Sequence, residues 1–183
     1  MASSQSLSES DRRVVAAWAA DCAERVLDLF AAEAPDDERP REAIARARAF
    51  SRGELDTAGE IRRRFVAGRA AHAVSGAAAI AAARAAAQAA GVAHMGAHAL
   101  GAAAYAAVAV GRAAPDRPQA TEDEIRWQVA RLSPAARSAL AQLPPLGEDS
   151  AGPLGTGLLA KGALGTAIRL LQTEIGSTTL REG

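Results

Sequence analysis

The sequence predicts an all-α fold: a single multi-helix bundle of about six to seven helices, followed by a C-terminal helical extension. Apolar residues recur with helical spacing, long segments are rich in the strong helix former Ala, and Gly, Pro and capping residues separate these segments. Alternating runs of β-branched or aromatic residues, which would indicate strands, are lacking.

The composition supports one helical domain whose core is made of small side chains. Of the 183 residues, 49% are hydrophobic but only 3% are aromatic, so we expect a core of Ala, Val, Leu and Ile. The 21 basic and 21 acidic residues give a net charge of zero, which argues against nucleic acid as a partner. The single Cys22 excludes an intrachain disulfide and fits a reducing compartment.

A soluble, cytoplasmic protein with no membrane partner is expected. Residues 1–10 lack the basic and apolar regions of a signal peptide, and residues 1–7 should form a frayed tail. The Ala-rich run 70–110 is interrupted by polar residues such as Arg84 and His94, and Ala is barely apolar enough for a membrane-spanning helix.

The first two helices are predicted over residues 8–33 and 39–52. Val14, Trp18 and Cys22 follow one another at intervals of four residues, which places them on one face of the first helix. Pro40 suits the first turn of the second helix, where its missing N–H costs nothing, and Gly53 ends that helix.

The middle of the chain is predicted to form three helices, over residues 57–75, 77–90 and 92–113. Thr57 and Glu60 have the spacing of a capping box, in which each side chain satisfies the free backbone N–H of the other residue. Gly76 separates the first two of these helices, and Gly91 ends the second.

The last third is predicted to form helices over residues 122–132, 133–142 and 156–176. Thr121 and Glu124 repeat the capping-box spacing. The last helix contains three glycines, each costing about 1 kcal/mol relative to Ala, so it must dock on this protein or on a partner. We therefore divide the chain into a helical bundle, residues 8–142, and a linker with a C-terminal helical extension, residues 143–183.

His94 and His98 are the candidate catalytic residues if the protein is an enzyme. Their spacing places both on one helix face and would also suit a metal ion. Met95 stands where zinc proteases have a glutamate, and a third ligand would have to come from a distant residue such as His72. We therefore predict no metal and no cofactor. The alternatives are a buried, hydrogen-bonded histidine or a pocket residue whose pKa lies near neutrality.

Arginines form the second group of candidate functional residues. Arg41, Arg48 and Arg52 share a helix face that could bind carboxylates or phosphates. The interpretation that we favour is a structural one, with salt bridges from this face to Asp21 and Glu24 of the first helix.

Two further patterns are expected to be structural. Arg62, Arg63 and Arg64, with Arg69, would point in several directions around a helix, which is typical of a solvated surface. Cys22 belongs to the apolar face of the first helix, where an inert, buried thiol is expected.

Three segments together carry a family resemblance. They are WAADCAERVL from Trp18, PDDERPREAI from Pro35 running on to RGEL at 52–55, and His94-x-x-x-His98-Ala followed by Ala-Tyr105-Ala. In this order and spacing they resemble the small helical immunity proteins of bacteria with an Imm-5-like domain. The resemblance covers roughly residues 9–132, leaves the C-terminal extension outside, and departs from the family at Phe50, where a Trp is expected.

The resemblance implies an immunity or self-protection protein. Its motifs supply the candidate binding residues, as shared salt bridges or a shared pocket: Trp18, Asp21, Arg25, Arg39, Arg52, Glu54 and Tyr105.

Two functional hypotheses follow. The favoured one is a non-enzymatic protein that binds a toxin protein or a toxic small molecule through a helical pocket. The alternative is a small biosynthetic enzyme of the cyclase or isomerase type, in which His94 or His98 acts as acid and base while Asp21 and arginines orient the substrate. A homo-oligomer is compatible with either hypothesis.

Overall fold

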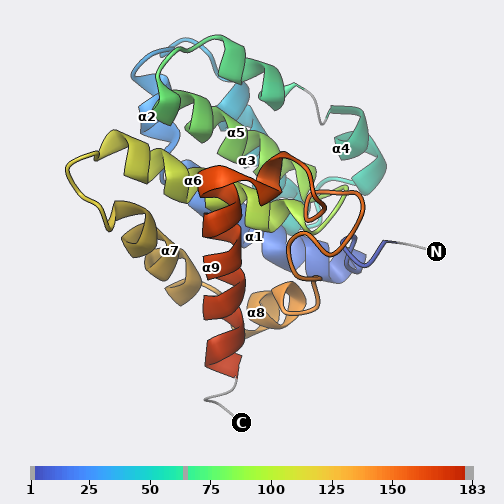
Figure 1. Ribbon diagram of the computed structural model, residues 1–183. Coiled ribbons are helices and arrows are strands. Elements are labelled where there is room, and N and C mark those ends of the chain that lie inside the picture. The colour runs from blue at the N-terminus through green and yellow to red at the C-terminus, as the bar shows by residue number, and fades with distance from the viewer. Residues whose placement is uncertain (1–2, 64–65, 180–183) are drawn as a thin grey trace.

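A computed structural model describes residues 3–63 and 66–179, and within these ranges it contains helices and no strand (Figure 1). The elements are α1 (Glu9–Glu24), α2 (Leu27–Ala31), α3 (Arg39–Ser51), α4 (Thr57–Arg63), the 3-10 helix η1 (Ala67–His72), α5 (Ala77–Gly91), α6 (His98–Ala113), α7 (Ala120–Ala130), α8 (Pro134–Leu140), the 3-10 helix η2 (Leu158–Ala160) and α9 (Gly162–Thr179). The predicted all-α class and helical bundle are confirmed.

Four of the predicted helices differ in their extent. The helix predicted over 156–176 is divided into η2 and α9, because the backbone is extended at Lys161 between them. The helix predicted over 8–33 is two helices, α1 and α2, because the backbone leaves the helical conformation at Val26. The helix predicted over 57–75 is divided into α4 and η1, with residues 64–65 outside the described part. The helix predicted from Val92 begins instead at His98. The residues just before it form a turn whose N–H groups bond to the N-terminal segment.

Neither predicted capping box forms, because both glutamates pair with arginines of other helices. Glu60 is 5% exposed and binds Arg46 of α3, while Glu124 is 3% exposed and binds Arg25 at the end of α1. A buried carboxylate needs a charged or hydrogen-bonding partner, and these arginines supply it. The two glutamates therefore link neighbouring helices instead of capping the helices to which they belong.

The centre of the bundle is the contact between α5 and α6, whose facing surfaces consist largely of Ala. The buried alanines are 79, 81, 82, 83, 85, 86 and 89 of α5 and 99, 102, 103, 104, 106, 107 and 109 of α6. Because an Ala side chain is a single methyl group, the two helices can lie closer together than helices that carry larger side chains at the contact. Helices α1, α2 and α3 pack against α5, while α7 and α9 pack against α6 (Figure 1).

The C-terminal extension docks on this protein itself. Helix α9 packs against α6 and α7 and fully buries Ile168 and Leu171 (Figure 1). The segment that precedes it buries Leu154 and Leu159 in the same hydrophobic cluster as the bundle. This burial offsets the cost of the glycines in α9. Residues 180–183 of the predicted extension lie outside the described part.

The N-terminal segment is fixed between the extension and the rest of the bundle. Gln5 is only 1% exposed, and its Nε2 donates to Asp149 Oδ2 at 2.7 Å and to the Ala151 carbonyl at 2.8 Å. Its Oε1 accepts from the backbone N–H of Leu154 at 2.9 Å. The prediction of a frayed tail is therefore wrong for residues 3–7, because a buried amide with satisfied partners holds them in place.

Replacing Gln5 tests this attachment. We expect Gln5→Ala to lower the free energy of unfolding by about 2 kcal/mol, because three partners lose a hydrogen bond within a largely buried contact. Urea unfolding at neutral pH measures the change. Gln142→Ala is the matched control, since that side chain is exposed and should change stability by less than about 0.5 kcal/mol. Equal effects of the two substitutions would contradict the attachment.

Candidate functional site

His94 and His98 lie on opposite sides of the point where α6 begins. His94 is exposed in the turn between α5 and α6, whereas His98 is the first residue of α6 and is partly buried. The prediction that both share one helix face is wrong, because the helix does not extend back to His94. The two histidines nevertheless line the same cavities.

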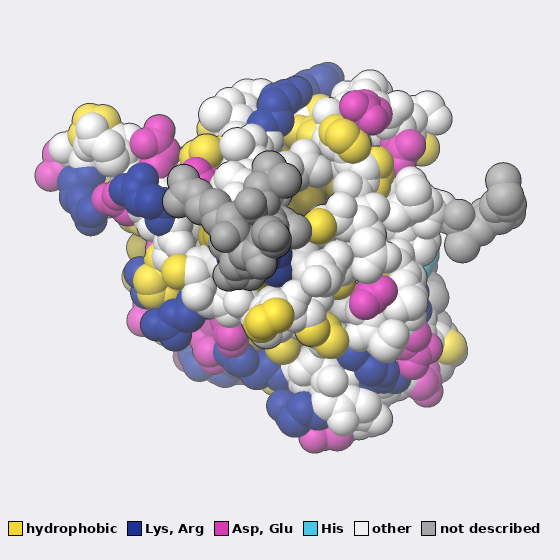
Figure 2. All heavy atoms as spheres, turned by 90° about the horizontal axis from the view of Figure 1, so that it is seen from below, with side chains coloured by type: hydrophobic (Ala, Val, Ile, Leu, Met, Phe, Trp, Pro, Cys, Tyr) yellow, Lys and Arg dark blue, Asp and Glu magenta, His cyan; other side chains and the backbone are white. Residues whose placement is uncertain are grey.

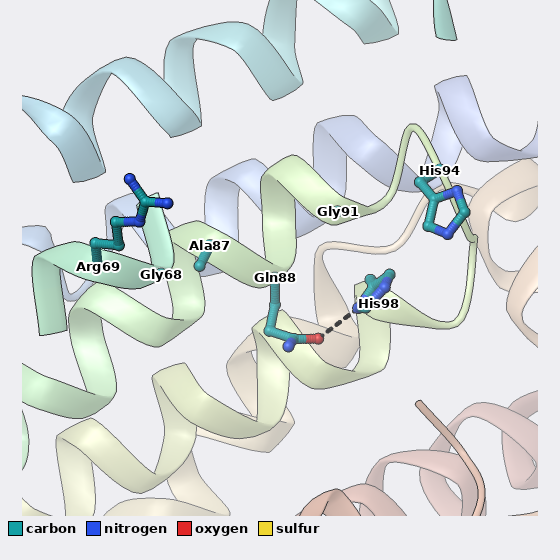
Figure 3. A pocket seen from close by; sticks show the side chains of 7 residues that line it. All are labelled: Gly68, Arg69, Ala87, Gln88, Gly91, His94 and His98. Carbon is teal, nitrogen blue, oxygen red and sulfur yellow. Dashed lines mark hydrogen bonds between the residues drawn. The ribbon is translucent and has the colours of Figure 1, made fainter. Parts of the chain in front are cut away.

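His98 forms a hydrogen-bonded pair with Gln88 of α5. Its Nδ1 lies 2.8 Å from Gln88 Oε1 (Figure 3). An amide oxygen can only accept, so Nδ1 carries the proton and Nε2 keeps its lone pair. Burial, with a smaller contribution from the charge of His94, lowers the pKa of His98 from its usual 6.5 to about 4. The imidazole is therefore neutral at neutral pH.

Two glycines make room for this pair. Gly91 lies three residues after Gln88 on α5, and a Cβ atom there would stand 3.0 Å from Cγ of the His98 ring. Gly101 lies three residues after His98 on α6, and a Cβ atom there would overlap the amide of Gln88. Each helix therefore carries a polar residue and, one turn later, a gap for the polar residue of the other helix.

A first cavity of about 580 Å³ opens beside the pair (Figure 3). Its walls come from η1, from α5, from the following turn and from the start of α6: Gly68, Arg69, Ala87, Gln88, Gly91, His94 and His98. Arg69 stands at one end of this row and His94 at the other. No Asp or Glu occurs among the described residues that line it, and Arg69 has no ion pair there.

A second cavity, of about 420 Å³, shares Gln88, His94 and His98 with the first. Its other walls are Met95, Tyr105 and residues of the C-terminal extension: Gly152, Pro153, Gly157, Leu158 and Leu159. The hydrogen-bonded pair of Gln88 and His98 therefore borders both cavities. Volumes of this size lie within the range of about 300–1,000 Å³ that small-molecule sites occupy.

Of the predicted binding residues, Tyr105 is the one that joins the histidines in this region. It is buried on α6, with the guanidinium of Arg84 at 5.9 Å from its ring centre. Arg84 forms no ion pair within the described ranges.

Two of the predicted residues, Trp18 on α1 and Arg25 directly after it, join neighbouring helices. Trp18 is buried, and its Nε1 donates to the backbone carbonyl of Gln128 at 2.8 Å. Arg25 contacts both carboxylate oxygens of Glu124, at 2.8 and 3.0 Å, and stacks on the ring of Trp127 at 4.0 Å. Neither residue lines the cavities described above.

The remaining predicted residues form salt bridges away from the cavities. Asp21 binds Arg48 of α3 at 2.6 Å, and Arg48 also binds Glu24, so the predicted salt bridges to the first helix are confirmed for Arg48. Arg41 and Arg52 pair instead with the nearby Glu38 and Glu54. The pairs of the other predicted binding residues are local: Arg39 with Asp37 at 2.5 Å, and Arg52 with Glu54 at 2.6 Å. A hydrogen bond from the partner arginine lowers the pKa of both acids, Asp37 and Glu54.

Other expectations concern metals, thiols and membranes. Among the described residues, no group of three His, Cys, Asp or Glu side chains could hold a metal ion. Cys22 is fully buried, and this burial raises its pKa well above the ordinary value, as expected of an inert thiol.

Within the described residues, no helix is long and apolar enough to cross a membrane. On the face seen in Figure 2, basic and acidic side chains are interspersed.

Sequence reasoning did not select Gln88, Gly91 or Gly101 as site residues. The available signal was a polar residue in an Ala-rich helix with a glycine three positions later, which occurs in both α5 and α6. Arg69 was expected on a solvated surface; it is exposed, and it also lines the first cavity.

Comparison with known proteins identifies the family. The family model described as "Imm-5 like putative immunity protein" matches residues 5–135, which is more than half of the chain. The chain therefore belongs to this family, and the resemblance found in the sequence is confirmed. No curated protein and no solved structure matches the chain.

The lowered pKa of His98 makes a prediction about stability. With pKa values of about 4 when folded and 6.5 when unfolded, the unfolded state binds more protons between these values, so stability falls as the pH is lowered from 7 towards 4. We expect a loss of about 2 kcal/mol from this residue between pH 7 and pH 4.5, measured by urea unfolding.

Two variants isolate this contribution from that of the other groups that titrate in this range. His98→Gln should remove it, whereas His94→Gln, at an exposed histidine, should keep most of it. The same pH dependence in wild type and His98→Gln would show that burial does not hold His98 neutral.

Proposed function

We propose that this immunity-family protein protects by binding a toxic agent, and that the agent binds at the two cavities bordered by Gln88 and His98. One observation carries this proposal: the pair is uncharged, mutually hydrogen-bonded and open to a cavity on either side. Nε2 of Gln88 and Nε2 of His98 make no hydrogen bond within the described residues. A donor and an acceptor are thus held in fixed positions for a ligand, which lowers the entropic cost of binding.

Binding accounts for the site better than acid and base catalysis. A catalytic acid or base works best when its pKa lies near the operating pH, whereas the pKa of His98 is about 4. Asp21, which the enzyme hypothesis assigns to substrate orientation, is bound to Arg48 instead. No carboxylate occurs among the described lining residues of either cavity to act as a second group.

The cavity sizes indicate what part of the agent is bound. Volumes of about 580 and 420 Å³ suit a group of small-molecule size rather than a folded protein surface. The bound group is accordingly a toxic small molecule, or a side chain that a toxin protein inserts.

A protection assay tests the proposal. Products of the neighbouring genes are expressed in a sensitive host together with wild type, the double variant Gln88→Ala/His98→Ala, or the control Arg41→Gln. Arg41 lies on α3 with its side chain 60% exposed, so its variant should protect as wild type does. We expect wild type to restore growth against at least one product and the double variant to be at least about tenfold weaker, as the loss of two hydrogen-bonding groups implies.

Two outcomes of this assay would overturn the proposal. One is that wild type relieves the toxicity of no neighbouring product. The other is that the double variant, shown to be folded by its helical circular dichroism, protects as well as wild type.

Stoichiometry separates binding from catalysis. Purified protein is titrated into a fixed amount of the toxic agent, and the residual toxic activity is followed over time. A binding protein removes activity up to about one equivalent and then stops. Progressive loss of activity at a small fraction of an equivalent would establish the enzyme alternative instead.

A further inference from the structure

The first cavity has a positive character. Arg69 lines it, is exposed, and has no ion pair among the described residues, while His94 lies at the other end (Figure 3). Every other described lining side chain is uncharged at neutral pH. A guanidinium without a partner forms strong, two-pronged hydrogen bonds to a carboxylate. The chemistry of this cavity therefore favours an anionic group.

The second cavity has an apolar character, and the extension provides most of it. Pro153, Leu158 and Leu159 come from the extension, and Met95 and Tyr105 face them from the bundle. Leu158 is 63% exposed, the more exposed of the two large hydrophobic side chains that lie on the surface in the described ranges. A ligand that covered Leu158 would remove apolar surface from water, which favours binding of an apolar group.

The two cavities adjoin at Gln88, His94 and His98, which line both. Of these three, Gln88 and His98 carry no charge at neutral pH that would repel an apolar group or attract a second ion. The free N–H of Gln88 can donate to an oxygen of a ligand that extends across this border.

We infer that the two cavities form one bipartite site for an organic carboxylate with an apolar body. The carboxylate lies in the first cavity, which Arg69 and Gln88 line, and the apolar body lies against Leu158 and Leu159 in the second. This inference rests on the proposed function, whose site it shares. It adds the chemical class of the bound group and the direction in which that group lies.

The inference also assigns a role to the C-terminal extension. The family match ends at residue 135, so the apolar wall of the second cavity comes from outside the matched region. The first cavity is lined entirely by residues within that region. The matched part of the chain thus recognises the anionic group, and the extension selects the apolar body attached to it.

Calorimetric titration with 4-phenylbutyrate tests the bipartite site. Two matched probes each lack one half of the recognition: 4-phenylbutanamide has no charge, and butyrate has no ring. We expect 4-phenylbutyrate to bind at least about tenfold more tightly than either, since each half contributes separately. Butyrate binding as tightly as 4-phenylbutyrate would exclude the apolar half, and equal binding of the amide would exclude the anionic half.

Variants assign each half to its cavity. Arg69→Gln should weaken 4-phenylbutyrate about tenfold while leaving the amide unchanged, because only the carboxylate interacts with the guanidinium. Leu158→Ser should weaken both phenyl compounds about threefold and leave butyrate unchanged. Both positions are exposed, so the fold should tolerate these changes, and Arg41→Gln is the control. No binding of 4-phenylbutyrate, or equal binding by Arg69→Gln and wild type, would overturn the inference.

The two proposals can fail separately. Protection that depends on Gln88 and His98, without binding of 4-phenylbutyrate, would refute the bipartite carboxylate site and keep the proposed function. Binding of the probe with the predicted response to Arg69→Gln, without protection against any neighbouring product, would refute the proposed function and keep the site.

Discussion

The close contact between α5 and α6 is the constraint on which the rest of the structure depends. Alanine methyl groups allow the two helices to approach, and a Cβ atom at position 91 or 101 would press against the His98 ring or overlap the Gln88 amide. The space that the glycines at these positions leave is filled by Gln88 and His98, which hydrogen-bond across the interface. Burial of the ring lowers the pKa of His98 and keeps it neutral at neutral pH.

Other parts of the chain form a cavity on each side of the contact between Gln88 and His98. On one side η1 brings Arg69 to the cavity, and on the other the extension brings Leu158 and Leu159. Among the contacts that hold the extension there, α9 packs against α6 and α7, and Gln5 bonds to the loop around residues 149–154. Order at the N-terminus and the shape of the second cavity therefore depend on the same few hydrogen bonds.

The sequence predicts helix boundaries well where local patterns determine them. It predicts them less well where residues distant in the sequence bind the groups that would begin or cap a helix. Periodicity and caps gave α3 and α8 within a residue or two, but the turn before His98 exists because its N–H groups bond to residues 5 and 6, far away in sequence. Glu60 and Glu124 have capping-box spacing, yet arginines of other helices bind them. The sequence likewise singled out His98 but could not reveal that Gln88 lies against it, since their contact depends on how α5 and α6 pack.

The most direct test of this account is a ¹⁵N NMR titration of the histidine side chains between pH 3 and pH 8. The account predicts that His98 is the tautomer protonated at Nδ1, with Nε2 unprotonated, and that it titrates with a pKa of about 4. A tautomer protonated at Nε2, or a pKa near 6.5, would contradict the account, because the ring would then not be both bonded to Gln88 through Nδ1–H and shielded from water.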